Sequence, residues 1–207
     1  HGREAEATAK LALGQNAEVI PGAFGDIWFR DTGPIFTADG QALGFKFNGW
    51  GGKYQLPHDG EVAARVALLA GAGFKQNDFI LEGGAIEMDG EGTLLTTRQC
   101  LLNPNRNAHW TEEGAEVALK RALGVEKILW LDEGLLNDHT DGHIDNLARF
   151  VAPGKVVCQS PANRDDPNHD VLEEIALSLG AMRDAKGRKL EVIRIPSVGL
   201  VEDEDGD

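Results

Sequence analysis

Apolar residues recur three and four positions apart in four segments of the chain, a spacing that predicts amphipathic helices. The predicted helices cover residues 4–13, 61–70, 111–123 and 169–179. A glycine closes each segment, as is common where helices end, because glycine adopts left-handed backbone angles without strain. These glycines are Gly14, Gly71, Gly124 and Gly180. The helices thus recur with a period of roughly 50 to 60 residues, which is typical of a repeat architecture.

Between the helices lie stretches rich in β-forming residues, and three of them contain a hairpin signal. The signals are Asp39-Gly40, Asp89-Gly90 and Pro153-Gly154. Further strands are predicted at residues 18–20, 79–81, 127–131 and 190–195, the last of which begins a fourth unit. The repeating order is therefore strand, polar loop, hairpin and helix, which indicates an α/β protein. A doubly wound βαβ sheet is the alternative, but it would not place a hairpin in every unit.

Acidic residues, glycines and a histidine gather in the loop between the first strand and the hairpin of each unit. The loops contain WFRDTGP (residues 28–34), LEGGAI (residues 81–86) and HTDGHIDN (residues 139–146). Glycine beside a polar residue permits close backbone approach, so loops arranged around a pseudo-symmetry axis can converge on one point. We expect Asp31, Glu82, His143 and Asp145 to meet there as an active site.

The chemistry of these side chains suits a flat cation. Asp31 and Asp145 can grip a planar guanidinium through paired, charge-assisted hydrogen bonds. His143 and Asp145 are two residues apart, so on a strand they would share one face, about 6 to 7 Å apart. Glu82 would orient the bound group or shuttle a proton, with His143 as general acid/base. Trp28 would wall an apolar slot for an aliphatic tail.

Each residue also has a structural interpretation. Asp31 would hydrogen-bond its own turn, Glu82 would end a strand, and Trp28 would belong to the core or to an interface. A metal site formed by His139, His143 and Asp145 is a further alternative. It requires a helix there, whereas Thr140-Asp141-Gly142 favours a turn, so no metal is predicted.

Composition narrows the classes of function. With 42% hydrophobic and 26% charged residues among 207, the chain has the composition of a globular protein. It has no apolar run of the roughly 20 residues that span a bilayer and no secretory signal at its start, which predicts a cytoplasmic protein. A net charge of −14 disfavours nucleic acid and anionic membranes and attracts cations. Cys100 and Cys158 lack CxxC spacing, so we expect reduced, buried thiols.

Four segments of the chain resemble the agmatine deiminase branch of the guanidino-group-modifying superfamily. They are WFRDTGPIF, FNGWGGKY (residues 47–54), the long EGG segment (residues 80–107) and TDGHIDNLARFVAPGKVV (residues 140–157). The resemblance implies a pentein-type α/β propeller of five ββαβ units, about three of which are present here. It assigns Asp31 and Asp145 to guanidinium binding, His143 to acid–base catalysis, Glu82 to the EGG carboxylate and Trp28 to the pocket. No cofactor is implied.

The implied reaction converts agmatine, a small cationic guanidino substrate, to N-carbamoylputrescine and ammonia on the way to putrescine. A cysteine thiolate attacks the guanidinium carbon, and water hydrolyses the thiouronium intermediate. In similar proteins that cysteine lies near the far C-terminus, after a glycine-rich stretch, whereas Cys100 matches a structural cysteine. His139 stands where close relatives often carry an acidic residue, so deimination of peptidyl or free arginine is an alternative.

The ends of the chain give a further expectation. The sequence begins inside a predicted helix without a clear cap and ends in the acidic run EDEDGD. We expect residues 1–207 to be a single partial catalytic domain, truncated at the C-terminus and at the N-terminus. A non-catalytic guanidinium-binding fragment is therefore another alternative. An incomplete propeller would expose an open edge, which predicts instability or association into a homo-oligomer.

Overall fold

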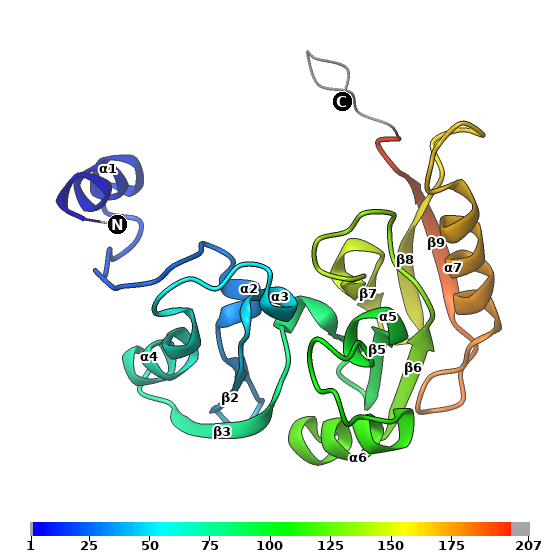
Figure 1. The fold of residues 1–207 in the computed structure, drawn as a ribbon, viewed down its shortest axis with the longest axis horizontal. Helices are drawn as coiled ribbons and strands as arrows, with labels where there is room; N and C mark the ends of the chain where they lie inside the picture. The colour runs from blue at the N-terminus through cyan, green and yellow to red at the C-terminus, as the bar shows by residue number, and fades with distance from the viewer. Residues whose placement is uncertain (1, 200–207) are drawn as a thin grey trace.

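Three units of the same topology make up most of the molecule (Figure 1). The computed structural model describes residues 2–199. The first unit consists of β1 (Ile35–Phe36), β2 (Gln41–Lys46), α4 (Val62–Leu69) and β3 (Gly73–Ile80). The second consists of β4 (Glu87–Met88), β5 (Thr93–Thr97), α6 (Glu112–Leu123) and β6 (Lys127–Leu131). The third consists of β7 (Ala148–Ala152), β8 (Lys155–Ser160), α7 (His169–Ala181) and β9 (Glu191–Pro196).

Each unit is a ββαβ motif with its own three-stranded sheet. The hairpin strands pair antiparallel, as in β1 with β2, and the strand after the helix pairs parallel with the second hairpin strand. The same pattern holds for β4, β5 and β6, and for β7, β8 and β9. The three predicted hairpins and their turns are confirmed. The predicted grouping of strands into units was wrong in one respect. Each strand that was expected to begin a unit is the last strand of the sheet of the preceding unit.

The predicted helices are all present, and their ends differ from the predicted ones by at most two residues. Thr111 caps α6 by accepting a hydrogen bond from the backbone N–H of Gly114, and Gly124 ends it in the left-handed conformation. Gly180 does not end α7, which continues to Ala181. The strand predicted at residues 18–20 does not form; those residues have no regular secondary structure and lie between α1 (Arg3–Leu13) and the first unit. Figure 1 shows α1 set apart from the units, and none of its residues is buried.

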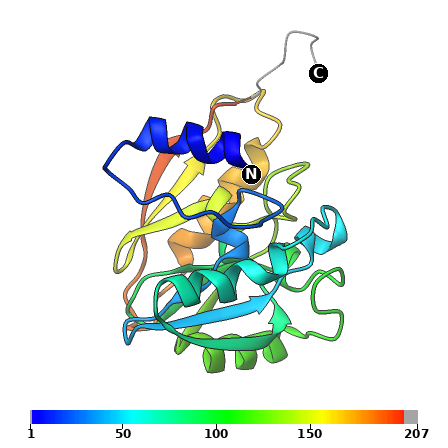
Figure 2. The same ribbon diagram turned by 90° about the vertical axis from the view of Figure 1, so that its left-hand side faces the viewer.

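Both faces of the central sheet are buried. Neighbouring residues of each strand point to opposite faces of the sheet, so one face packs against the first unit and the other against the third. Leu94 of β5 and Ile128 of β6 pack with Leu43 of the first unit in one core cluster. Leu95 and Leu129 pack with side chains of the third unit in a second cluster, which also contains Val156, Cys158, Ile175 and Leu179. The second unit therefore ties the other two together. Figure 2, seen from the side of the first unit, shows α4 over the strands of that unit.

The outer faces of the flanking sheets keep apolar surface. Phe74 on β3 is 39% exposed, and Ile193 and Ile195 on β9 are 39% and 49% exposed. Association of the chain through such surfaces stays a prediction. Within residues 2–199 no helix is long and apolar enough to traverse a bilayer. The acidic run at residues 202–207 lies outside the described residues.

One helical turn precedes the first strand of each unit. These turns are α2 (Phe29–Thr32), η2 (Gly83–Ala85) and η3 (Ile144–Asn146). They pack against one another, α2 on η2 and η2 on η3, at the meeting point of the three units. Three other short helical segments are α3 (Gly49–Gly52), η1 (Asp59–Glu61) and α5 (Arg98–Leu101). The polar loops expected to converge do converge, through these turns.

Candidate active site

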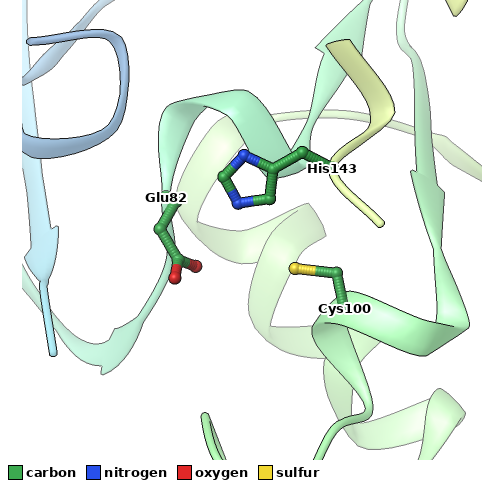
Figure 3. A group of neighbouring side chains, drawn as sticks. All are labelled: Glu82, Cys100 and His143. Carbon is green, nitrogen blue, oxygen red and sulfur yellow. The ribbon is translucent and has the colours of Figure 1, made fainter. Parts of the chain in front are cut away.

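One cavity of about 440 Å³ is lined by four of the five predicted site residues, Trp28, Asp31, His143 and Asp145. The fifth, Glu82, does not line this cavity but lies in the interior beside His143 (Figure 3). Glu82 and His143 occupy equivalent positions, each as the extended residue just before the short turn of its unit. The fold therefore gathers all five residues, drawn from three successive units, at one place.

Asp31 is held by groups remote in the sequence. Its Oδ2 accepts a hydrogen bond from Trp50 Nε1 at 3.0 Å, and its Oδ1 accepts one from the backbone N–H of Gly84 at 2.8 Å. Trp50 makes this contact from a left-handed backbone conformation, with φ of 52°, which is uncommon for a residue with a side chain. Asp31 is 9% exposed. It is thus a fixed carboxylate at the cavity wall and not a residue that bonds only its own turn.

His143 faces both aspartates. Its Nδ1 lies 3.7 Å from Asp31 Oδ1 and 4.0 Å from Asp145 Oδ1. The expectation that His143 and Asp145 share a strand face was wrong, because Asp145 lies in the turn η3 and β7 begins only at Ala148. Burial lowers the pKa of His143 to about 4, against the opposing effect of Asp31. The imidazole is therefore neutral at pH 7 and able to accept a proton.

Asp145 is the more open of the two carboxylates, with a side chain 20% exposed. Burial and the neighbouring Asp31 raise its pKa to about 6, and Arg30, whose Nε lies 3.9 Å from Asp145 Oδ2, opposes the rise. Two carboxylates beside one neutral imidazole form an acidic wall. A cation bound between them would favour the ionised form of Asp145.

Glu82 is fully buried, with no exposed surface. Burial raises the pKa of its carboxyl, and Arg106, whose Nε donates to Oε1 at 2.9 Å, opposes that rise. Its second oxygen, Oε2, has no hydrogen-bond partner, and the same holds for His143 Nε2. Glu82 therefore does more than end a strand, because its carboxylate is directed into the interior beside the imidazole.

The two glycines of the EGG motif are required by packing. A Cβ on Gly83 would lie 2.0 Å from the carbonyl oxygen of Arg30. A Cβ on Gly84 would lie 2.5 Å from His143 Nδ1, 2.6 Å from Asp31 Oδ1 and 2.8 Å from Asp145 Oδ2. Gly84 thus occupies the point at which the three polar side chains meet.

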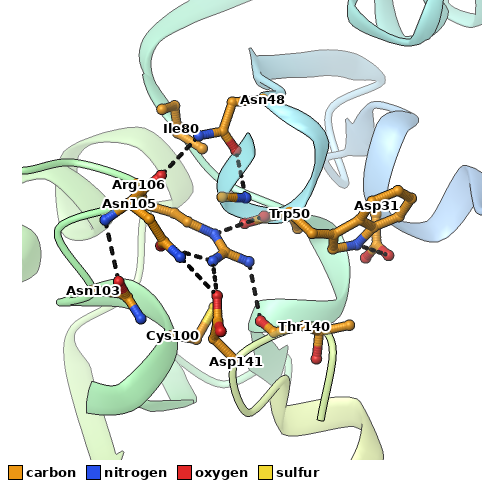
Figure 4. A network of polar contacts seen from close by, with 12 residues as sticks. Asp31, Asn48, Trp50, Ile80, Cys100, Asn103, Asn105, Arg106, Thr140 and Asp141 are labelled. Carbon is orange, nitrogen blue, oxygen red and sulfur yellow. Dashed lines mark hydrogen bonds and ion pairs between the residues drawn. The ribbon is translucent and has the colours of Figure 1, made fainter. Parts of the chain in front are cut away.

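Arg106, which was not among the predicted site residues, connects the second and third units (Figure 4). Its buried guanidinium binds Glu82, the carbonyl oxygen of Thr140 at 3.0 Å, and Asp141. Hydrogen bonds from Lys53, Asn105 and Arg106 lower the pKa of Asp141, although burial, the largest single influence, opposes them. The signal was present in NPNRN within residues 103–107, but a lone arginine in a polar loop is ordinarily a surface residue.

Aromatic rings close the outer part of the cavity. Tyr54 and His139 stack with ring centroids 5.9 Å apart, and the Tyr54 hydroxyl lies 2.5 Å from His139 Nδ1. Trp28 is 60% exposed at the rim, so its interpretation as a core residue was wrong. The arrangement combines an acidic inner wall with apolar rings outside, which suits a flat cation carrying an aliphatic tail.

The alternative metal site is not formed. Residues 139–143 are turns and bends, not the helix that His139 and His143 would need as joint ligands. Among residues 2–199, His139, His143 and Asp145 are not a group whose ligand atoms lie together. Cys100 and Cys158 are both buried and unpaired, as predicted.

Comparison with known proteins assigns the family. The profile of Porphyromonas-type peptidyl-arginine deiminases matches residues 1–207. The agmatine deiminase of Pseudomonas aeruginosa (strain LESB58) is 41% identical over 208 residues, which cover 96% of this chain and 56% of that protein. The agmatine deiminase of Ectopseudomonas mendocina (strain ymp) is 40% identical over 186 residues, covering 85% and 50%. The chain therefore belongs to the Porphyromonas-type peptidyl-arginine deiminase family, and the resemblance drawn from its motifs is confirmed.

Solved structures of this group share the fold. The substrate-bound agmatine deiminase of C. jejuni superposes with a TM-score of 0.84 at 32% identity, covering 96% of this chain and 59% of that one. The agmatine deiminase of Enterococcus faecalis gives a TM-score of 0.77 at 33% identity, covering 86% and 54%. The chain spans 56% of the length of the P. aeruginosa relative.

Proposed function

We propose that the full-length protein to which this chain belongs is an agmatine deiminase, and that this chain binds the guanidinium group of agmatine. The product would be N-carbamoylputrescine, with ammonia released, on a route to putrescine. The observation that carries the proposal is the placement of Asp31, His143 and Asp145 around Gly84 in one cavity. Relatives named agmatine deiminases, at about 40% identity, support the choice of substrate.

Guanidinium binding is assigned to the two aspartates. Asp31 is fixed by Trp50 and Gly84, so its carboxylate is oriented before the substrate arrives. Asp145, whose Oδ1 lies 4.0 Å from the same His143 Nδ1, would contact a second edge of the planar cation. The butyl chain and distal amine of agmatine would extend outward past Trp28 and Tyr54, toward Asp26 at the cavity wall.

His143 is assigned the proton transfers. The ring of His143, which is neutral at pH 7 because its pKa is lowered to about 4, would take the proton of a cysteine thiol. The thiolate would bond to the guanidinium carbon, and His143 would pass the proton to the departing nitrogen, which leaves as ammonia. The ring would then take a proton from water as the hydroxide attacks the thiouronium carbon. The carbon–sulfur bond would break, the ring would return its proton to the departing thiolate, and the ureido product would lose its extra proton to solvent.

The nucleophile in this proposal is a cysteine outside residues 1–207, in which the two cysteines are Cys100 and Cys158. Burial raises the pKa of Cys100, and that thiol does not line the cavity. Cys158 packs in the core between the second and third units. The C. jejuni structure with bound substrate is a cysteine-to-serine variant, which agrees with a cysteine-dependent reaction in that relative.

We also propose that the three ββαβ units are three blades of a five-bladed pentein-type propeller. The 56% coverage of the P. aeruginosa relative supports this count, since three fifths of a propeller is a similar share. A structure of the full-length protein would test it, and a closed ring of five sheets is the expected result.

Ureido product measured after incubation with agmatine, free arginine or an arginine peptide tests the function. We expect the highest kcat/KM with agmatine and a loss of at least about 100-fold in the Asp31→Asn and Asp145→Asn variants. A preference for the arginine peptide would mean that peptidyl arginine, and not agmatine, is the substrate. Binding of agmatine without turnover by the full-length protein would favour a guanidinium-binding role instead.

A further inference from the structure

Glu82, Cys100 and His143 form a compact cluster beneath the cavity, and Figure 3 shows their polar ends directed toward one another. Glu82 and His143 precede the turns η2 and η3, and Cys100 lies in α5. One carboxylate oxygen, one ring nitrogen and the sulfur lie within 4.8 Å of one another. The exposed fractions are 0%, 0% and 2% for Glu82, Cys100 and His143.

Two atoms of this cluster are buried without a hydrogen-bond partner. They are Glu82 Oε2 and His143 Nε2. The other polar atom of each side chain has its own neighbours. Glu82 Oε1 accepts a hydrogen bond from Arg106, and His143 Nδ1 faces Asp31 and Asp145. Buried polar atoms are nearly always satisfied in folded proteins, so an unsatisfied pair directed at a thiol calls for an additional partner.

We propose that Glu82 Oε2, Cys100 Sγ and His143 Nε2 bind one Zn²⁺ ion. Zinc accepts carboxylate, thiolate and imidazole ligands, and three protein ligands leave a fourth position for water. At zinc–ligand distances of about 2.0 to 2.3 Å, tetrahedral ligand atoms lie roughly 3.5 Å apart. The three groups would therefore close around the ion by about 1 Å, within the reach of side-chain rotation.

Charge balance favours the bound state. Zinc displaces the thiol proton of Cys100, which leaves as H⁺, so the cluster gains one net positive charge. The carboxylate of Glu82 and the thiolate then supply two negative charges to the divalent ion, while the carboxylate of Asp141 is paired with Arg106 and Lys53. Glu82 bridges the two cations through separate oxygens, with Oε1 on Arg106 and Oε2 on the metal.

The consequence for catalysis rests on the proposed deiminase function. With zinc on Nε2, the neutral ring of His143 keeps its proton on Nδ1 and loses its ability to accept another. The metal lies on the interior side of the ring, away from the substrate cavity. Zinc would therefore lower kcat and leave KM for agmatine nearly unchanged, as a reversible inhibitor that does not compete with substrate.

Metal binding to the full-length protein tests the site without any enzyme assay. We expect one equivalent of Zn²⁺ to remain after dialysis and to be retained by Cys158→Ser, a matched buried cysteine outside the cluster. Cys100→Ser should weaken binding at least about 100-fold. Retention of zinc by Cys100→Ser, or its absence from the wild-type protein, would overturn the proposal.

Cobalt substitution provides the second measurement. The wild-type and Cys158→Ser proteins loaded with Co²⁺ should both show a thiolate-to-cobalt charge-transfer band, which remains decisive even where Cys100→Ser fails to fold. A cobalt spectrum without that band would exclude Cys100 as a ligand. Zinc binding with no agmatine turnover even after a chelator has removed the metal would refute the deiminase assignment alone. Turnover that is insensitive to zinc, in a protein that binds none, would refute the metal site alone.

Discussion

Gly84 is the residue on which the geometry of the candidate site depends most directly. Any Cβ there would contact His143, Asp31 and Asp145 at less than 3.0 Å. We expect Gly84→Ala to displace these side chains, destabilise the protein by about 1 to 3 kcal/mol and weaken agmatine binding at least tenfold. Thermal unfolding and calorimetric binding would measure both effects.

Gly60→Ala is the matched control for that substitution. A Cβ at Gly60 would meet no heavy atom within 4 Å, so stability and binding should stay near the wild-type values. Unchanged agmatine affinity in Gly84→Ala would show that the three polar side chains do not jointly contact the substrate.

Protonation of Asp145 gives a prediction about pH. Its pKa is raised to about 6, so the carboxyl becomes neutral as the pH falls below that value, whereas a guanidinium cation needs the ionised form. Agmatine affinity should fall by up to tenfold per pH unit below about 6 and be constant above 7. His143, with a pKa of about 4, stays neutral throughout this range.

Calorimetric titration between pH 5 and 8 would measure this dependence. Asp145→Asn removes the titrating group, so its weaker binding should not vary between pH 5 and 7. A wild-type affinity that is constant from pH 5 to 8 would contradict the role assigned to Asp145.

At the scale of residues, the sequence predicted which polar side chains meet but not how they are held. Asp31 and Asp145 were identifiable because acidic residues beside glycines recur in the loops of successive units. The indole N–H of Trp50 on Asp31 was not identifiable, since it depends on a left-handed backbone angle that no pattern signals. Arg106 was missed for a similar reason, because its carboxylate partners lie 24 and 35 positions away in the sequence.

The loops of the second and third units are joined by Arg106. Removing its charge leaves Glu82 buried without its cation, and breaking a buried pair in this way costs about 3 to 5 kcal/mol. We expect Arg106→Gln to lower the free energy of unfolding by this amount and to reduce deiminase activity, because the Thr140 and Asp141 loop before His143 loses its anchor.

Arg121→Gln, on the exposed side of α6, is the control and should change stability by less than about 0.5 kcal/mol. Chemical denaturation would measure both variants. Equal stabilities would mean that the Arg106 pair does not support the fold.

At the scale of elements, periodicity predicted the helices well and strand pairing poorly. The helix spacing and the three hairpin turns follow from local patterns, which the chain carries within a few residues. Local patterns do not show which strand pairs with the strand after each helix. The pairing of β3 with β2, or of β6 with β5, is determined by long-range packing. Gly180 shows the same limit, since α7 continues through it to Ala181.

At the scale of the whole molecule, the second unit links two cores through adjacent residues of one strand. Leu94 belongs to the core shared with the first unit, and Leu95 to the core shared with the third. Because both cores use the same sheet, loss of either should weaken the entire structure. Leu94→Ala and Leu95→Ala should each cost about 2 to 5 kcal/mol and retain a single unfolding transition.

Differential scanning calorimetry distinguishes this cooperative behaviour from independent units. Leu177→Ala, at a position 74% exposed on α7, serves as the control and should leave the midpoint nearly unchanged. Two resolved transitions in Leu94→Ala, with one at the wild-type temperature, would show that the first unit unfolds by itself. A single transition displaced to lower temperature in both variants would indicate that Asp31, from the first unit, is held against His143, from the third, by one continuous folded body.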